Sequence, residues 1–173
     1  QIVYHDTTDA SGAPNETAMK NAGLPINDQK ITYRRSKTKI PHNKFIVRLQ
    51  GGTAPVEVWT GSTNFTPSGF LGQTNVGHRV ADAATARQYL TFWELVKTDP
   101  ESADARTTLA ALTPNPAEEI PANSMTRLFS PRRKAEMLGW YGRRMLDAAN
   151  SVWFTAAFGV SKELIEPIAR KRR

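Results

Sequence analysis

The chain of 173 residues carries a formal net charge of +7, is 39% hydrophobic and contains no cysteine. This balance is typical of a folded globular protein, and the absence of cysteine excludes a disulfide framework and a thiolate metal site. The most apolar stretch without charged residues, 148–161, is far shorter than the roughly 20 residues that cross a bilayer. We therefore expect a soluble chain. Because it starts in a strand pattern and ends in a helix pattern, we also expect it to be part of a longer protein.

The first predicted elements are short and lead into a basic segment. Residues 2–5 (IVYH) indicate a strand, a polar loop follows over 6–15, and 16–23 suit a short helix. Residues 31–36 (ITYRRS) indicate a second strand. Basic residues in and after this strand could help to gather a phosphate; they are Arg34, Arg35, Lys37 and Lys39.

The stretch 40–78 predicts a β-hairpin, which is the central feature of the chain. Residues 45–49 (FIVRL) form a strand pattern, Gly51 and Gly52 indicate a turn, and 56–60 (VEVWT) return as a second strand. In an antiparallel pair, the residues that precede the first strand and those that follow the second lie at the same end. The hairpin therefore brings the segments HNK and GSTN together.

Four polar side chains are expected to converge at that end of the hairpin. His42 and Lys44 lie two residues apart, so strand alternation points both to one face, and Ser62 and Asn64 follow the returning strand. An imidazole, an ammonium, a hydroxyl and a carboxamide suit an anionic oxygen cluster such as a phosphodiester. Alone, HxK is more often a solvated strand end and GSTN a turn, so the prediction depends on their conjunction.

The residues after the hairpin indicate a third strand and two helices. Residues 75–82 suit a strand, on which Asn75 and His78 are three positions apart and so face opposite sides. Residues 84–97 carry aromatic and aliphatic side chains at helical spacing, which favours packing on the sheet over a base-stacking platform. A further helix is expected to begin at Asp99-Pro100 and to end near Leu112.

The C-terminal part repeats the alternation of helix and strand. Residues 114–125, with three prolines, suit a linker, and 132–150 an amphipathic helix. The apolar run 151–160 (SVWFTAAFGV) predicts a buried strand, and 161–171 another helix, which together make an α/β unit. The expected divisions are a domain over 1–113, a linker over 114–125 and the start of a second domain over 126–173.

The order of these motifs resembles that of the phospholipase D superfamily, whose members cleave phosphodiesters through a phosphohistidine. The matching positions are HxK at His42 and Lys44, then two strands, then GSxN at Ser62 and Asn64. The resemblance covers the later part of a first repeat and the beginning of a second. It implies an α/β fold with a mixed sheet flanked by helices.

The resemblance also implies a role for each matching residue. His42 would be the nucleophile, or the partner acid if the two halves of a site exchange roles. Lys44 and Asn64 would hold nonbridging phosphate oxygens, and Ser62 would support the phosphate or the histidine. A neutral imidazole can attack phosphorus, and a fixed ammonium stabilises the developing charge. We expect no cofactor and no metal, because no cluster of metal ligands accompanies these residues.

The chain departs from the family pattern in three respects. The spacing from HxK to GSxN exceeds the family's commonest spacing by several residues, which the turn at Gly51, Gly52 and Thr53 can absorb as a longer hairpin. Leu49 stands where the motif HxKxxxxD places its aspartate, and Val76, Gly77 and His78 follow Asn75 where many relatives have a glutamate. A catalytic histidine usually has a third group that orients its other nitrogen. Glu57 is the nearest carboxylate on the hairpin but is not assigned that role; Asn75, His78 and Glu57 are possible supporting residues.

Two classes of function fit this sequence. The first is a phosphodiesterase that hydrolyses a phospholipid or a nucleic acid; the second is a catalytically inactive phosphate-binding or scaffold module. Only one HxK is present, so a second half-site would come from a downstream repeat or, as the less favoured alternative, from a homodimer. The 11 basic and 4 acidic residues of 127–173 suit a phosphate-rich partner, although interspersed charges on helices are also common on solvated faces.

Overall fold

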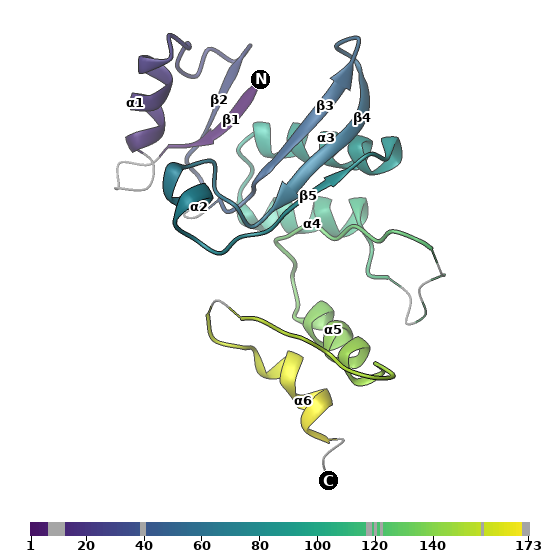
Figure 1. Ribbon diagram of the computed structural model, residues 1–173. Helices are drawn as coiled ribbons and strands as arrows, with labels where there is room; N and C mark the ends of the chain where they lie inside the picture. The colour runs from purple at the N-terminus through teal and green to yellow at the C-terminus, as the bar shows by residue number, and fades with distance from the viewer. Residues whose placement is uncertain are drawn as a thin grey trace. The chain divides into compact units, whose positions relative to one another are not determined.

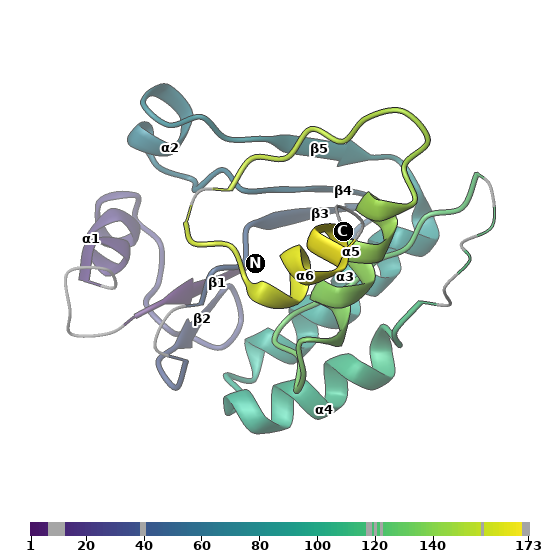
Figure 2. The same cartoon turned by 90° about the horizontal axis from the view of Figure 1, so that it is seen from below.

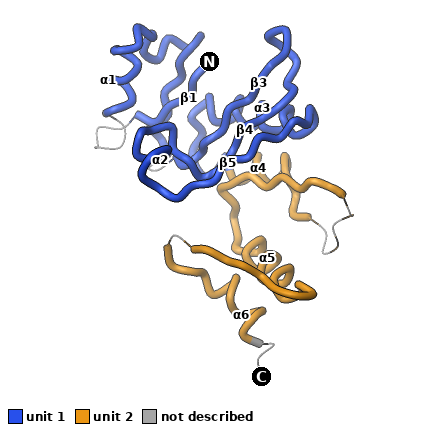
Figure 3. The backbone as a smooth tube through the Cα atoms, in the orientation of Figure 1, with its two compact units in different colours: residues 1–105 blue, residues 106–173 orange. Residues whose placement is uncertain are grey.

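The computed structural model describes residues 1–6, 13–38, 41–116, 119, 121, 123–156 and 158–170. It divides the chain into unit 1, residues 1–105, and unit 2, residues 106–173 (Figure 3). The division falls inside helix α4 (Ser102–Leu112), and the predicted linker 114–125 belongs to unit 2. Among the described residues, no helix is long and apolar enough to cross a membrane.

Unit 1 combines helices and strands, which confirms the predicted α/β class (Figure 1). Its strands form a parallel pair, β1–β2, and an antiparallel sheet in the order β3–β4–β5. The expected single mixed sheet is wrong for the described residues, because no strand pairing joins the two sheets. In chain order the elements are β1 (Ile2–His5), α1 (Ala13–Asn21), β2 (Thr32–Arg35), β3 (Phe45–Gln50), β4 (Ala54–Gly61), α2 (Pro67–Leu71), β5 (Gly77–Val80) and α3 (Ala83–Lys97).

The predicted hairpin is formed by β3 and β4. Gly51 and Gly52 adopt φ angles of 59° and 77°, which glycine reaches without the steric cost of a side chain. The antiparallel register pairs Phe45 with Thr60, and β5 then pairs Val80 with Val58. The hairpin, its glycine turn and the third strand were all predicted correctly from the alternation of side chains.

Helix α3 contacts the strands of both sheets. The ring of Phe45 lies 5.2 Å from that of Tyr89 and 5.5 Å from that of Phe92, measured between centroids. On the other sheet, Tyr33 meets Trp93 edge to face at 5.7 Å. These pairs confirm that the aromatic side chains of 84–97 belong to the core, where such contacts add about 0.5–1.5 kcal/mol each to burial.

Two carboxylates fix the ends of β2. Asp28 accepts hydrogen bonds from the backbone N–H groups of Lys30, Ile31 and Thr32, which lower the pKa of its carboxyl to about 2. At the other end, Asp99 accepts from the N–H groups of Ser36 and Lys37. Strand β2, which leads towards the predicted site, is therefore held at its start by the nearby Asp28 and at its end by Asp99, which follows α3.

Unit 2 contains the rest of α4 with α5 (Glu136–Leu146) and α6 (Lys162–Arg170), the last two side by side in Figures 1 and 2. Helix α5 is shorter at both ends than the helix predicted over 132–150. Trp140 on α5 and Leu164 on α6 are buried. The close approach requires glycine at position 142, because a Cβ there would lie 2.6 Å from the carbonyl oxygen of Leu164.

The predicted buried strand 151–160 is wrong. Its described residues, all but Ala157, form no strand and are exposed, with Trp153 exposed to 93%. A strand needs a neighbouring strand to satisfy its backbone groups. The described part of unit 2 offers only helices, so the apolar run has nothing to pair with. The assignment of 126–173 to a second repeat used this strand and remains a prediction.

The two glycines of α5 allow a matched test of this packing. We expect Gly142→Ala to lower the free energy of unfolding by about 1–3 kcal/mol, because the new Cβ clashes with the backbone of α6. Gly139→Ala is the control, since its Cβ comes no closer than 3.5 Å to Arg143, and helix propensity favours alanine by up to about 1 kcal/mol. Urea titrations followed by circular dichroism measure both; equal stability of the two variants would contradict the packing.

Candidate functional site

Three strand ends bring the predicted site residues to one end of the antiparallel sheet. Because Phe45 pairs with Thr60, the segment that precedes β3 and the segment that follows β4 lie at the same end. The pairing of Gly61 with Gly77 adds the segment before β5, and the N–H of Ser62 donates to the carbonyl of Val76 at 2.9 Å. The strand register thus brings the segments HNK and GSTN to one end of the sheet, as the hairpin predicts, and places Asn75 at the same end (Figure 1).

Lys44 is a buried cation with no carboxylate partner among the described residues. The residue is exposed to only 8%, and Nζ donates one hydrogen bond, of 2.8 Å, to the carbonyl oxygen of His42. Burial lowers the pKa of the ammonium. An ammonium has three N–H donors, so in the described structure two remain for an anion.

His42 is exposed, and its ring has no hydrogen-bond partner among the described residues. Leu49, at the position of the motif's aspartate, lies further along β3 and offers no polar atom. Nothing in the described structure therefore fixes which ring nitrogen carries the proton. A nucleophilic histidine usually has such an orienting group, and the described structure supplies none for His42.

Ser62 and Asn75 form a connected group. Ser62 Oγ donates to Asn75 Oδ1 at 3.1 Å and accepts from the N–H of Val76 at 3.0 Å. Asn75 Nδ2 in turn donates to the carbonyl of Gly69 in α2 at 3.0 Å. These bonds hold Ser62 rather than His42, and the supporting role of Asn75 in the site remains a prediction.

Asn64 presents its side chain to solvent. The carboxamide makes no hydrogen bond in the described structure, while the Asn64 carbonyl accepts from the N–H of Thr66 at 2.8 Å. No hydrogen bond joins His42 or Lys44 to Ser62 or Asn64 in the part of the chain that the structure describes. The strand register brings the two pairs to one end of the sheet without joining them by a hydrogen bond among the described residues.

The two other candidate supporting residues differ in their surroundings. Glu57 forms ion pairs with Arg48 on β3 and Arg79 on β5, both at 2.5 Å, so its carboxylate is occupied along the sheet. These pairs lower the pKa of Glu57 against the effect of desolvation. His78 pairs with Thr60 in the ladder and is exposed. Neither residue contacts His42 in the described structure.

One hydrogen bond and one helix near the site were not predicted. Asn43, the middle residue of HNK, accepts a hydrogen bond of 2.9 Å from Arg35 on β2. Helix α2, which supports Asn75, was also missed, although Thr66 followed by Pro67 is a helix start signal: Thr66 Oγ1 caps the N–H of Gly69 at 3.1 Å. Lys39, expected to help gather a phosphate, lies outside the described residues.

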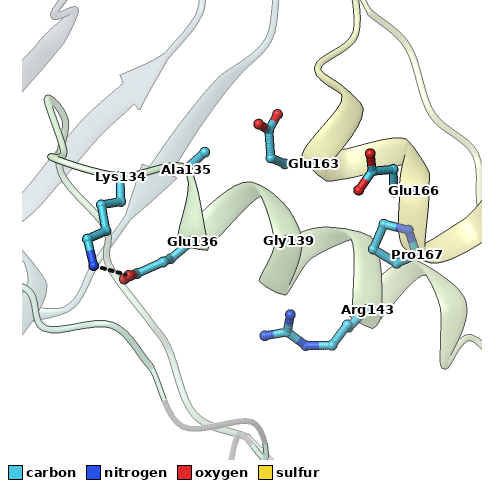
Figure 4. Close-up of a pocket in the computed structure, with 8 residues that line it drawn as sticks. All are labelled: Lys134, Ala135, Glu136, Gly139, Arg143, Glu163, Glu166 and Pro167. Carbon is cyan, nitrogen blue, oxygen red and sulfur yellow. Dashed lines mark ion pairs between the residues drawn. The ribbon is translucent and has the colours of Figure 1, made fainter.

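Unit 2 has an open pocket between α5 and α6 that contains none of the predicted site residues (Figure 4). Its lining mixes both charges, and Lys134 pairs with Glu136 at 3.3 Å. The lining residues are Lys134, Ala135, Glu136, Gly139, Arg143, Glu163, Glu166 and Pro167. With three carboxylates against two cations, this pocket is a poor match for a phosphate.

Comparisons of the chain with protein-family models, with curated proteins and with solved structures found no match. Within the described residues, no group of three or more His, Asp or Glu side chains could hold a metal ion.

Gly61, the first residue of the GSTN segment, provides a test of the strand arrangement. A Cβ at this position would lie 2.1 Å from the carbonyl oxygen of Val76, so Gly61→Ala must separate β4 from β5. We expect a loss of about 1–3 kcal/mol in the free energy of unfolding and faster hydrogen exchange at the Val76 amide. Gly72→Ala is the control, with its Cβ at 3.4 Å from Ser68 and an expected change within about 0.5 kcal/mol. Unchanged exchange at Val76 in the Gly61 variant would contradict the close approach.

Proposed function

We propose that the chain supplies one half of the active site of a phospholipase D-like phosphodiesterase. The observation that carries the proposal is the buried Lys44 ammonium, which has no carboxylate partner among the described residues and lies beside His42 at the sheet end that also presents Ser62 and Asn64. Burying a charge without a counter-charge is costly unless a ligand supplies one. A phosphodiester is an anion with two nonbridging oxygens that an ammonium and a carboxamide can bind.

In the proposed reaction, a neutral His42 nitrogen attacks phosphorus and the bond from phosphorus to the leaving oxygen breaks. Lys44 offsets the charge that develops on the nonbridging oxygens, with Asn64 as a second donor. A proton must reach the leaving oxygen, and water must then attack the phosphohistidine and release His42. Both steps need a second acid–base group, which we assign to a second half-site.

The alternative is an inactive phosphate-binding or scaffold module on the same sheet. It is favoured by one specific observation, the lack of any group that orients the His42 ring in the described structure. Such a module would bind phosphate through Lys44 and Asn64 without turnover. Both alternatives apply equally to the phosphodiester of a phospholipid and to that of a nucleic acid, because the proposed contacts of Lys44 and Asn64 involve only the phosphate.

Substitutions at the HxK segment separate the two alternatives in the full-length protein. With bis(p-nitrophenyl) phosphate as substrate, we expect His42→Ala to lower kcat by at least about 1,000-fold, because the nucleophile is lost. Lys44→Met, which keeps the apolar stem, is expected to lower kcat/KM by about 100-fold. His5→Gln on β1 is the control histidine. If the His42→Ala variant turned over substrate at the wild-type rate, the nucleophile assignment would be wrong. If the wild-type protein bound phosphate but did not hydrolyse the substrate, the scaffold alternative would be favoured.

The half-site assignment predicts a dependence on chain length or on self-association. Residues 1–173 alone are expected to bind inorganic phosphate weakly and to turn over little substrate. A C-terminally extended chain is expected to gain activity as a monomer if the second half lies downstream, and the molar mass of each species in solution is measured alongside the rate. Full activity of monomeric 1–173 would contradict the assignment, and activity confined to a dimer would favour the homodimer.

A further inference from the structure

Arg35 is the second buried cation next to the HxK segment. It is the last residue of β2 and is exposed to only 7%. Its Nη1 donates to Asn43 Oδ1 at 2.9 Å and its Nη2 to Thr38 Oγ1 at 3.3 Å, while its buried Nε has no hydrogen-bond partner in the described structure. Both acceptors are neutral, so no carboxylate among the described residues is hydrogen-bonded to the guanidinium.

The neighbouring Arg34 has the opposite environment. Successive residues of a strand point to opposite faces, and Arg34 lies on the exposed side with ion pairs to Asp6 at 2.5 Å and to Glu16 at 3.2 Å. The two adjacent arginines therefore differ in their partners: Arg34 pairs with carboxylates, whereas Arg35, itself buried, binds the neutral oxygens of the exposed Asn43 and the half-buried Thr38.

The environment of Arg35 is unfavourable for a purely structural residue. Burial lowers the pKa of its guanidinium, and Asp99 raises it only in part. The carboxylate of Asp99 is itself engaged by the N–H groups of Ser36 and Lys37. An apolar side chain of similar volume would fill such a position without the cost of desolvating a charge. The arrangement is explained if the fork of Arg35 performs a task that an apolar residue cannot.

The position of Asn43 identifies that task. Asn43 lies between His42 and Lys44, and its side chain is bound by Arg35, while the His42 carbonyl is bound by Lys44 Nζ at 2.8 Å. The three-residue segment precedes β3 and belongs to no helix or strand. Two buried cations therefore set its conformation, one through a side chain and the other through the backbone.

We propose that Arg35 is a positioning residue that holds Asn43, and through it the His42–Lys44 segment, in the conformation that accepts a phosphate. This inference rests on the proposed function, since it concerns the same site. The planar guanidinium spans Asn43 and Thr38 with two separate nitrogens, which a lysine ammonium does not reproduce. Arg35 does not touch the phosphate itself; its effect passes through Asn43.

Charge-conserving variants test the proposal without removing a cation from the interior. Arg35→Lys keeps the positive charge and loses the fork, and Arg34→Lys is the matched control on the same strand, because lysine can still pair with Asp6 and Glu16. The probe is inorganic phosphate bound to the 173-residue chain and titrated by NMR, with thermal melts to establish that each variant is folded. We expect Arg35→Lys to weaken phosphate binding about fivefold, the effect of losing roughly one net hydrogen bond, and Arg34→Lys to change it less than twofold.

A double-mutant cycle with Asn43→Ala establishes whether Arg35 acts through Asn43. We expect Asn43→Ala to weaken phosphate binding to a similar extent, and the double variant to be no more than about twofold weaker than Arg35→Lys alone. In the absence of phosphate, Arg35→Lys is expected to shift the amide signals of residues 42–44 while leaving that of Val58 unchanged. A purely structural role would lower the melting temperature without this local signature or the change in affinity.

Three other results would contradict the positioning role, its action through Asn43 or the proposed site. If Lys44→Met weakens phosphate binding but Arg35→Lys binds like the wild type, the positioning role is wrong and the proposed site stands. If the effects of Arg35→Lys and Asn43→Ala are additive, Arg35 does not act through Asn43. If the wild-type chain shows no phosphate-dependent shift at residues 42–44, both the positioning role and the proposed site are wrong.

Discussion

The antiparallel register of β3 and β4 is the constraint on which the rest of unit 1 depends. Pairing Phe45 with Thr60 sends Phe45 towards α3, where it meets Tyr89 and Phe92, and places HNK beside GSTN at the sheet end. A slip by one residue would turn every side chain of the strand to the other face. The aromatic core and the candidate site are therefore two consequences of one pairing.

The site end of the sheet is unusual in how its charges are balanced. On the middle of the sheet, Glu57 lies between Arg48 and Arg79, so every charge there has an opposite neighbour. At the end of this sheet, the Lys44 ammonium is buried against a neutral oxygen. Arg35, on β2 of the parallel pair, is buried against neutral oxygens as well, and Asp99 compensates its charge only in part. The positive charge that binds the HxK segment is thus buried and at most partly compensated, which is the distribution expected of an anion site.

Much of unit 1 could be predicted because its signals are local. Alternating side chains and the Gly51-Gly52 turn define the hairpin, and helical spacing defines α3. The run 151–160 failed because an apolar sequence indicates burial only when another element is present to cover it. The Arg35–Asn43 bond could not be predicted either, since it depends on how the end of β2 approaches the start of β3, and two neighbouring arginines look alike in a sequence.

The carboxylate of Asp99 has a consequence for the order of folding. It binds the backbone N–H groups of Ser36 and Lys37 across 63 and 62 residues of sequence, and Asp99 itself adopts a φ of 49°, a left-handed conformation that non-glycine residues rarely take. Such a contact closes a long loop, which costs more chain entropy than the local contacts of the intervening elements. On a ribosome, the segment that enters the site would remain without this anchor until all of α3 had been synthesised.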